Sequence, residues 1–422
     1  MAELDLSSDA PPRSMAVDLL GRLRNTSVPL SHAYLPVLEA VVNSIHAIED
    51  RFGRTAVRRG SITVDLERDG QAGLSAFGGR PSLEGVRSIT IRDNGIGFDE
   101  RCFEAFLTSD TSAKVERGGK GVGRFSWLVV FRRAVVESRY VGPQGELRQR
   151  SFTFEAQAGG IFSHSDSEAD GELEPYSSIR LEEPKKRYEE GLRRGADVVA
   201  EKIFEHCFNY FIMDQAPRID VVDASHDANA SVNERRSEIL DDAVQNLEVL
   251  GHRLQVRSIH RKYGTGRKHM GHLCANNRVV TSFPLSSVSK LSGPIDAADG
   301  SRFMQELFVT GSALDNSVDA SRTRLELPDG DPLFESSGEL DLKTLRARLG
   351  EHVDALWADR FAKEEEENFQ RISHHIRSQQ PEYRHLIERK PESIRNVKWD
   401  DDKGELDRRL YRVQQDYESD VR

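Results

Sequence analysis

The sequence is poor in cysteine and lacks long apolar runs. Its three cysteines, Cys102, Cys207 and Cys274, are far apart and form no CxxC pair, so nothing indicates a zinc ribbon, a redox dithiol or a disulfide framework. No stretch of about 18 apolar residues is present. The N-terminal residues are acidic and interrupted by proline, without the basic region and apolar core of a signal peptide. We therefore expect a cytoplasmic protein that does not span a membrane.

Acidic residues outnumber basic ones. The 422 residues include 59 lysines and arginines against 70 aspartates and glutamates, which gives a formal net charge of −11. This balance disfavours wholesale nucleic-acid binding but leaves room for a local basic patch. At roughly 100 to 200 residues per domain, the length indicates two or three domains, each able to bury its own core.

The patterns in the first half of the chain indicate an α+β fold. Apolar residues at helical spacing and alternating runs rich in β-branched residues follow an N-terminal arm, residues 1–15. The predicted elements are helices at 16–24, 35–51 and 192–211, an antiparallel pair of strands at 61–66 and 88–92, a polar loop at 99–117, and further strands at 134–140, 149–156 and 178–181. This order predicts a sandwich with helices on one face of a sheet.

The second half divides into two further regions. The polar segment 224–238 is typical of a domain boundary. After it we expect a second α/β domain at 239–340 and a charged helical region at 341–422. The helical region is either a dimerisation or partner element or a solvated appendage.

Three short segments carry candidate chemistry, and the first lies in the predicted helix 35–51. Glu39 and Asn43 are four residues apart and therefore share one face of that helix. A carboxylate there can orient and deprotonate a water, and an amide oxygen can complete the octahedral shell of Mg²⁺. His46 follows one turn later, and we expect a structural role for it.

The second segment, DNGIG, follows a predicted strand. Asp93 at the strand end can accept a hydrogen bond from an exocyclic base amine. Gly95 and Gly97 have no Cβ and let the backbone approach a planar ring closely.

The third segment, GGKGVGR, is glycine-rich and precedes an apolar run that is expected to begin a helix. Backbone N–H groups at such a helix start can bind phosphate, and Lys120 or Arg124 can add positive charge. The segment has neither the GK[ST] of a Walker A loop nor the strand and ribose-binding acid of a Rossmann fingerprint.

Taken in order, the three segments resemble the N, G1 and G2 boxes of the GHKL ATPase superfamily, over residues 16–215. The resemblance implies a Bergerat-type ATP-binding α/β sandwich at 16–223 with ATP and Mg²⁺ as cofactors. It implies Glu39 as general base, Asn43 as the Mg²⁺ ligand, Asp93 on the adenine amine, and Ser178 where the family has a threonine that helps hold the base. The other nucleotide-binding residues it implies are Gly95, Gly97, Ser112, Gly119, Lys120, Gly121, Val122, Gly123 and Arg124.

The second domain is similar to the transducer or middle domain that follows the ATP domain in the heat-shock-90-like branch. Residues 272–280, HLCANNRVV, resemble its strand-turn-strand segment. Residues 314–327, LDNSVDASRTRLEL, are similar to its catalytic loop, so Arg322 is implied to reach the γ-phosphate. A permanently charged guanidinium suits the charge that develops in phosphoryl transfer.

A basic segment at 249–295 lies in this second domain. It contains no acidic residue, and its cations are Arg253, Arg257, Arg261, Lys262, Arg267, Lys268, Arg278 and Lys290. Such a segment is a phosphate track for DNA or RNA, a docking face for an acidic partner, or a solvated sheet face. His269, His272 and Cys274 have no fourth ligand at a spacing that suits zinc.

We therefore expect an ATP-hydrolysing conformational switch that dimerises on ATP and acts on a partner protein or nucleic acid. Bacterial relatives of this size resemble ATPases of defence or DNA-processing modules, an analogy at the level of fold. The alternatives are a nucleotide-dependent binding module with negligible hydrolysis and a heat-shock-90-like chaperone.

Overall fold

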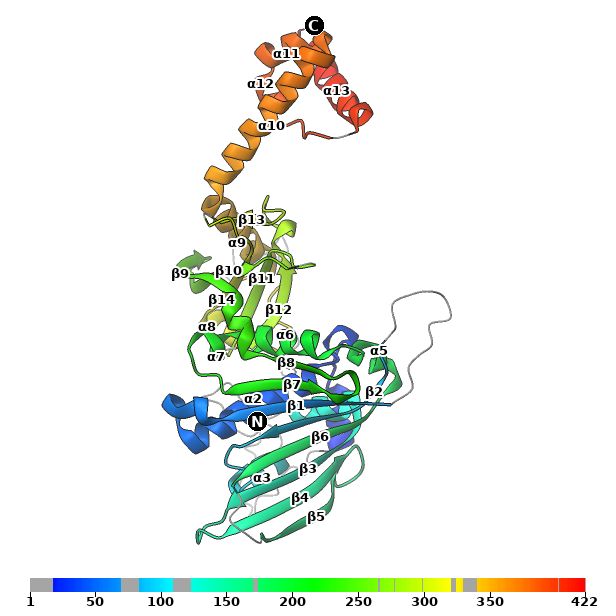
Figure 1. The fold of residues 1–422 in the computed structure, drawn as a ribbon, viewed down its shortest axis with the longest axis vertical. Coiled ribbons are helices and arrows are strands. Elements are labelled where there is room, and N and C mark those ends of the chain that lie inside the picture. The colour runs from blue at the N-terminus through cyan, green and yellow to red at the C-terminus, as the bar shows by residue number, and fades with distance from the viewer. Residues whose placement is uncertain are drawn as a thin grey trace, which may run out of the picture. The chain divides into compact units, whose positions relative to one another are not determined.

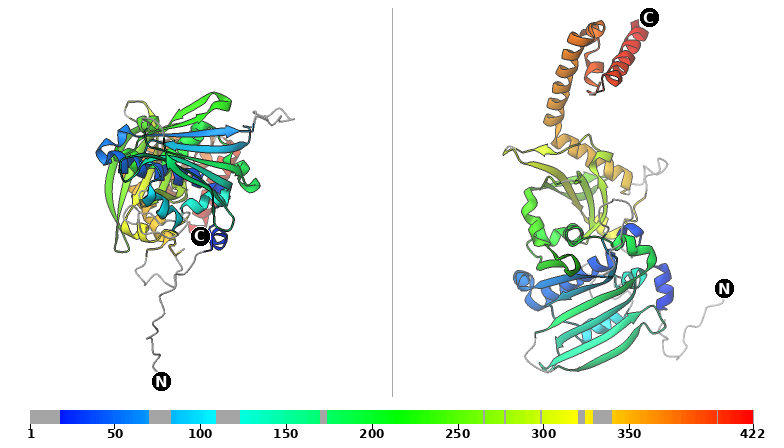
Figure 2. Two further views of the ribbon diagram at one scale, coloured as in Figure 1. Left: turned by 90° about the horizontal axis from the view of Figure 1, so that it is seen from below. Right: turned by 45° about the vertical axis from the view of Figure 1, so that its right-hand side comes forward.

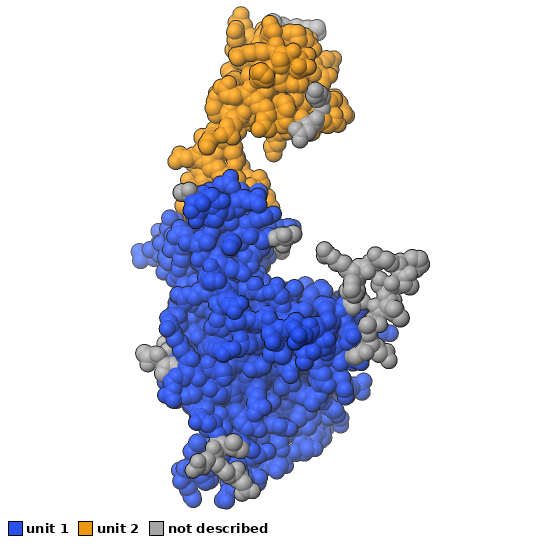
Figure 3. Space-filling view, in the orientation of Figure 1, with its two compact units in different colours: residues 1–284, 293–344 blue, residues 285–292, 345–422 orange. Residues whose placement is uncertain are grey.

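The computed structural model is an α+β protein built on two mixed sheets. It describes residues 18–69, 83–108, 123–169, 174–264, 266–276, 278–297, 299–319, 324–328, 340–400 and 402–421. The chain forms two compact units, residues 1–284 with 293–344 and residues 285–292 with 345–422 (Figure 3). Both sheets belong to the first unit, and the second unit begins close to the predicted boundary at residue 341.

The first sheet has eight strands in the order β5-β4-β3-β6-β2-β1-β7-β8 (Figure 1). The strands are β1 Ser61–Arg68, β2 Val86–Asp93, β3 Phe131–Val141, β4 Leu147–Glu155, β5 Ile161–Glu168, β6 Tyr176–Pro184, β7 Arg218–Asp223 and β8 Ala228–Ser231. Among these described strands, all pairs are antiparallel except β1 with β7. In β1 and β6, buried and more exposed residues alternate, as expected of a sheet that packs through one face.

Helices cover the apolar face of this sheet, which Figure 2 shows from two further directions. They are α1 Leu19–Asn25, α2 Leu35–Phe52, α3 Glu100–Leu107, α4 Gly123–Val130, α5 Glu189–Leu192, α6 Ala196–His206 and α7 Phe208–Ile212. Helix α2 begins with Pro36 in its first turn and ends at Gly53, whose φ of 75° closes the helix. Because α2 packs on β1, β2, α4 and α6, most of its residues are buried.

The predicted helix pair and the first antiparallel strand pair are confirmed, and four details differ. The loop expected at 99–117 contains α3, which Asp99 caps. Strand β5 is not predicted by any pattern, because its residues are polar and mostly exposed. The helix expected at 192–211 is two helices that meet at Cys207. The boundary segment 224–238 contributes β8 to the first sheet, so this sheet extends beyond residue 223.

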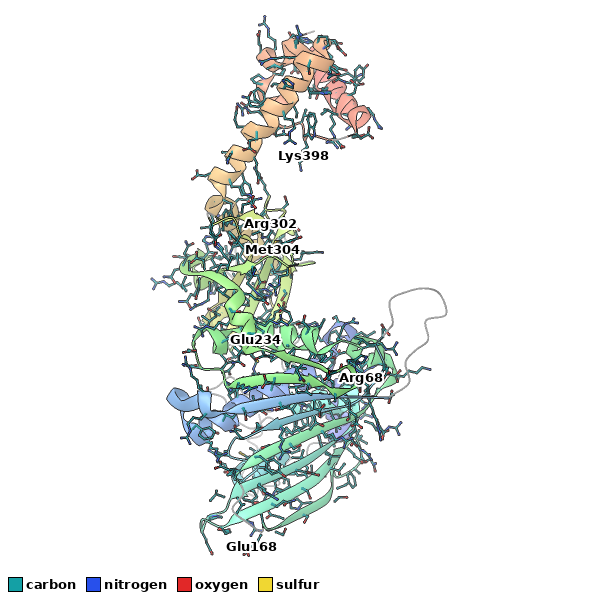
Figure 4. All side chains as sticks on the ribbon, in the orientation of Figure 1. Arg68, Glu168, Glu234, Arg302, Met304 and Lys398 are labelled. Atoms are coloured by element: carbon teal, nitrogen blue, oxygen red, sulfur yellow. The ribbon has the colours of Figure 1, made fainter. Side chains whose placement is uncertain are left out.

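The second sheet has the order β12-β11-β14-β10-β9, with β13 paired to β14. Its strands are β9 Ile239–Val249, β10 His252–Lys262, β11 Met270–Ala275, β12 Arg278–Pro284, β13 Ile295–Asp296 and β14 Arg302–Thr310, followed by the short helix α8 Ser312–Asn316. Arg302 and Met304, at the start of β14, are labelled in Figure 4. The predicted strand-turn-strand segment at 272–280 is confirmed as the β11 and β12 hairpin.

Helices α6 and α7 pack against both sheets. Phe208 of α7 stacks on Phe308 of β14 with ring centroids 3.5 Å apart. Ile259, Cys274 and Phe308 of the second sheet belong to the same buried cluster as the apolar face of the first. The two sheets therefore share one continuous core, in which the packing of one sheet depends on the other.

The second unit is helical apart from residues 285–292, as predicted for the C-terminal region. Helix α9 Leu342–Leu356 leads into it, followed by α10 Ala358–Gln379, α11 Arg384–Arg389, α12 Pro391–Arg395 and α13 Lys403–Val421. Its core includes Ile372, Ile376, Leu406 and Leu410. Within the described residues of the whole chain, no helix is long and apolar enough to cross a membrane.

Candidate functional site

Helix α2 presents the first pair of predicted residues. Glu39 and Asn43 lie one turn apart, so their side chains share a face, as the spacing predicts. Glu39 is only 4% exposed, and Asn43 is half-buried. A charged group so deeply buried needs a compensating partner, and the identity of that partner is central to the site.

The loop after β2 packs directly on α2. Asp93 accepts hydrogen bonds from the Ser44 hydroxyl at 2.7 Å and from the backbone N–H of Gly95 at 2.8 Å. The N–H of Ile96 donates to the carbonyl of Ala47 on α2. The structure thus brings the DNGIG segment next to the helix that carries Glu39 and Asn43.

The two glycines of this loop are required by close packing. A Cβ at Gly95 would lie 2.6 Å from the Cβ of Ala47. Gly97 has a φ of 81°, and a Cβ there would lie 2.0 Å from the carbonyl oxygen of Arg139. Any side chain at either position would push the loop away from α2 or β3.

One residue of β3 and one of β4 support the loop. The Ser138 hydroxyl on β3 accepts from the N–H of Phe98 at 2.7 Å. Arg150 on β4 donates to the carbonyls of Phe98 and Asp99, at 3.1 and 3.0 Å. Arg150 itself is buried and pairs with Asp166. No sequence motif points to either support.

Ser178 lies on a different face of the sheet from Asp93, whereas the preceding serine shares a face with it. In β6, Ser177 pairs with Asp93 of β2 and Ser138 of β3, and its side chain is on the buried face, 3% exposed. Ser178 pairs with Arg92 and Glu137 and therefore faces the opposite side of the sheet. Ser177 is the hydroxyl that shares a face with Asp93.

Helix α4 starts against Glu39. A Cβ on Gly123, its first residue, would lie 2.4 Å from Oε2 of Glu39. The end of the glycine-rich segment thus borders the predicted base. Ser112, Gly119, Lys120, Gly121 and Val122 lie outside the described residues.

Arg124 does not have the position expected for a phosphate ligand. Its Nη2 donates to the carbonyl of Thr108 at 2.8 Å, and its guanidinium lies over the rings of Phe106 and Phe125. Arg124 is 9% exposed. It ties the end of α3 to the start of α4, a packing role that also uses its charge.

The cation that reaches the predicted site from the second sheet is Arg278. Its Nη1 lies 2.7 Å from Oε1 of Glu39, and both side chains are buried. The sequence draws attention to Arg278 only as one cation of the basic segment. Arg322, the arginine implied to act from this domain, lies outside the described residues, although the flanking residues Val318 and Leu325 form a β-bridge.

The surroundings of this ion pair are apolar enough to change several pKa values. Burial opposes the charge of Arg278, but the Glu39 carboxylate, together with Tyr210 and Cys207, outweighs burial and raises the pKa of the guanidinium. Burial, reinforced by Arg278, lowers the pKa of His206 to about 4. Burial also raises the pKa of Cys207 and of Tyr210, each to about 12. These three groups are therefore neutral near pH 7, and the charges next to one another are Glu39 and Arg278.

His46 occupies a structural position on α2. Its Nε2 shares a hydrogen bond with the Tyr210 hydroxyl at 3.0 Å, and the two rings meet edge to face. This contact joins α2 to α7, in line with the structural role expected for His46.

Half of the basic segment is neutralised. Arg257 pairs with Asp242, Arg261 with Glu201 and Glu238, Arg267 with Glu238, and Arg278 with Glu39. The carboxylates come from outside residues 249–295, so a sequence window could not show them. Arg253, Lys262, Lys268 and Lys290 are exposed. Because these four arginines are paired with carboxylates, only the exposed cations of 249–295 remain as candidates for contacting phosphate.

His269 and His272, for which the sequence shows no zinc-like spacing, form hydrogen bonds in the second sheet. His269 contacts the carbonyl of Gly293 and the N–H of Gln305, and His272 contacts the Ser282 hydroxyl. Cys274 is buried. In the part of the chain that the structure describes, no cluster of three potential metal ligands occurs.

No family model and no curated protein matches the chain. The functional argument therefore depends on the residues and their geometry. Ser177 and Arg278, which the sequence did not single out for this site, lie next to it. Ser178 is on the other face of the sheet, and Arg124 contacts Thr108. The predicted residues that lie around α2 are Glu39, Asn43, Asp93, Gly95, Gly97 and Gly123.

Proposed function

We propose that the chain is a Mg²⁺-dependent ATP-binding and ATP-hydrolysing conformational switch with a Bergerat-type first domain. One observation carries the proposal: the three segments singled out in the sequence meet at one helix, α2. Asp93 bonds to Ser44, the Gly95 loop packs on Ala47, and Gly123 opens α4 beside Glu39. Convergence of the three segments at one helix is what a single ligand site built from all of them requires.

The residues present suit an adenine nucleotide. Asp93 is a carboxylate on the buried face of a sheet, where it can accept from an exocyclic amine, and Ser177 lies beside it on the next strand. Gly95 and Gly97 let this loop pack tightly on α2 and β3, which holds the backbone next to Asp93 in place. Specificity for adenine would arise from this hydrogen-bonding pair, because a base without an amine at this position would lose those hydrogen bonds.

The phosphate end would lie toward Glu39 and Asn43. Asn43 would supply an amide oxygen for Mg²⁺. Backbone N–H groups for phosphate are expected from the glycine-rich segment, of which the structure describes Gly123 and Arg124. A bound Mg²⁺ would neutralise phosphate charge as hydrolysis proceeds. Glu39 would accept the proton of the attacking water, the role of a general base.

The direct test is turnover of ATP by the wild type and by E39Q. We expect E39Q to lose about a hundredfold or more in turnover while still binding ATP, because the change removes the proton acceptor and keeps the shape. E49Q is the matched control, since Glu49 is a second buried glutamate on α2; it should retain turnover. Steady-state phosphate release and equilibrium binding of a non-hydrolysable ATP analogue measure the two quantities.

Either alternative outcome is informative. If the wild type binds ATP without measurable turnover, the chain is a nucleotide-dependent binding module. If E39Q turns over ATP as fast as the wild type, Glu39 is not the base.

The same proposal includes a change of assembly and a partner. ATP binding would draw two copies together, and the trapped E39Q protein should then show a larger mass with ATP than without it in size-exclusion light scattering. Within the basic segment, Arg253, Lys262, Lys268 and Lys290 are exposed and could meet a nucleic acid. Stimulation of turnover by DNA or RNA that fades with salt would support a nucleic-acid partner, whereas suppression of client aggregation would support a chaperone.

A further inference from the structure

The buried pair of Glu39 and Arg278 joins the proposed hydrolytic base to the second sheet. The two side chains are 6% and 4% exposed, and Nη1 of Arg278 lies 2.7 Å from Oε1 of Glu39. Breaking such a pair would leave a buried charge without its partner, which is strongly unfavourable. Glu39 therefore keeps this orientation as long as the second sheet keeps its place.

The position of Arg278 is set by the second sheet. Arg278 is the first residue of β12 and pairs with Ala275 across the β11 and β12 hairpin. Asn276, two residues before it, has a left-handed φ of 50°, and its N–H donates to Oδ1 of Asp315 at 2.6 Å. The hairpin and α8 together aim the arginine at α2.

The two oxygens of Glu39 face different parts of the molecule. Oε1 accepts from Arg278, whereas Oε2 lies next to Gly123, at the start of α4 and the end of the glycine-rich segment. A general base must hold one oxygen toward the water it deprotonates, and a carboxylate fixed at its other oxygen is oriented for this task.

We infer that Arg278 is the positioning residue for Glu39: it holds Oε1 so that Oε2 is presented at the start of α4. Because Arg278 belongs to the second sheet, the rate of hydrolysis depends on the position of that sheet. This inference rests on the proposed function, and it gives the second sheet the role of orienting the general base Glu39. Arg278 acts through Glu39, so its loss affects the chemical step and leaves nucleotide binding intact.

The test compares R278K and R278M with the wild type in the full chain. R278K keeps the charge on a shorter, less directional group, and R278M removes the charge. We expect turnover to fall about tenfold or more in R278K and further in R278M, with the affinity for a non-hydrolysable ATP analogue within about threefold of the wild type. R257K is the matched control, because Arg257 forms an ion pair with Asp242 on the same sheet and does not contact Glu39.

An indirect variant covers the case in which a change at Arg278 prevents folding. D315A removes the acceptor that holds the turn before Arg278, and D315N keeps an acceptor oxygen. D315A should lower turnover severalfold at unchanged analogue affinity, and D315N should restore it. Circular dichroism melting confirms that each variant is folded.

The outcomes separate this inference from the proposed function. If the wild type neither binds nor hydrolyses ATP, the proposed function fails and this inference with it. If the wild type hydrolyses ATP, E39Q does not, and R278K and R278M both match the wild type, only the positioning role is overturned. If the Arg278 variants lose analogue affinity in step with turnover, Arg278 is a nucleotide ligand and the positioning role is again overturned.

Discussion

The geometry around Asp93 depends on single side chains and on the face of the sheet to which each belongs. Asp93, Ser177 and Ser138 occupy adjacent strands on the buried face of the first sheet. Ser138 already accepts from the loop, and Ser44 donates to Asp93 from α2. Ser177 is a further buried hydroxyl beside Asp93, on the neighbouring strand.

Ser177 and Ser178 therefore provide a matched pair of variants. We expect S177A to weaken ATP binding about fivefold, because one hydrogen bond contributes about 1 kcal/mol. S178A should leave binding unchanged, since Ser178 is on the opposite face. Titration of both variants with ATP measures this difference, and a larger loss in S178A than in S177A would contradict the assignment.

The sequence identifies the residue types of this site but not always their register. Glu39, Asn43, Asp93, Gly95 and Gly97 are candidates because of their motifs and the family that these motifs resemble. Two consecutive serines in a strand give no sign of which one points inward until the partner strands are known. Arg124 shows the same limit, because its position next to a glycine-rich segment suggests phosphate, whereas Phe106 and Thr108 hold it.

At the scale of elements, charge is balanced across α6, β10 and β14. Arg261 of β10 is buried and contacts three carboxylates: Glu201 of α6, Glu306 of β14, and Glu238, which precedes β9. Glu205 of α6, Arg267, and His272 of β11 also face Glu306. This cluster links a helix of the first sheet's layer to the second sheet.

Glu306 should make stability depend on pH. Burial raises its pKa to about 7, with Glu205 and Glu201 adding to the shift and Arg261 and Arg267 opposing it. Because the folded pKa exceeds the usual value of 4.5, this group stabilises the fold fully below pH 4.5 and loses that contribution as the pH rises through about 7. The difference corresponds to a few kcal/mol at most, or about 1.4 kcal/mol per unit of pKa.

The variant E306Q tests this dependence, because glutamine resembles the protonated acid. Relative to the wild type, we expect E306Q to gain stability as the pH is raised from 5 to about 8. Burial lowers the pKa of His272 to about 3, so this residue destabilises the fold as the pH falls below 6.5. The wild type and E306Q both contain His272, so its effect cancels in the comparison. Urea unfolding at several pH values gives the comparison, with E248Q at an exposed site of the same sheet as control. A constant difference between E306Q and the wild type across this range would contradict the prediction.

Elements with strong periodicity are predictable from the sequence, and elements with weak periodicity are not. Helix α2 and strands β1 and β2 have long apolar patterns, and all three are confirmed. Strand β5 is polar, and α3 has only two turns, held by Asp99 and by the burial of Phe103 and Phe106. Short elements of this kind derive their stability from tertiary packing rather than from a sequence pattern.

At the scale of the whole molecule, the sequence predicts which segments matter, and the fold determines how they are joined. The order of the three segments by itself indicates a nucleotide site. The shared core through α6 and α7, and the contact of Arg278 with Glu39, join residues more than two hundred positions apart. No local pattern records such a contact, because it arises only when both sheets are packed.

The most direct test of the nucleotide site is calorimetric titration of Mg²⁺ and ATP into the wild type and into D93N. The account predicts that the wild type binds ATP and that D93N binds at least tenfold more weakly, or about 1.4 kcal/mol, because an amide donates where the adenine amine needs an acceptor. Equal binding by the two proteins, or no binding by the wild type, would contradict it.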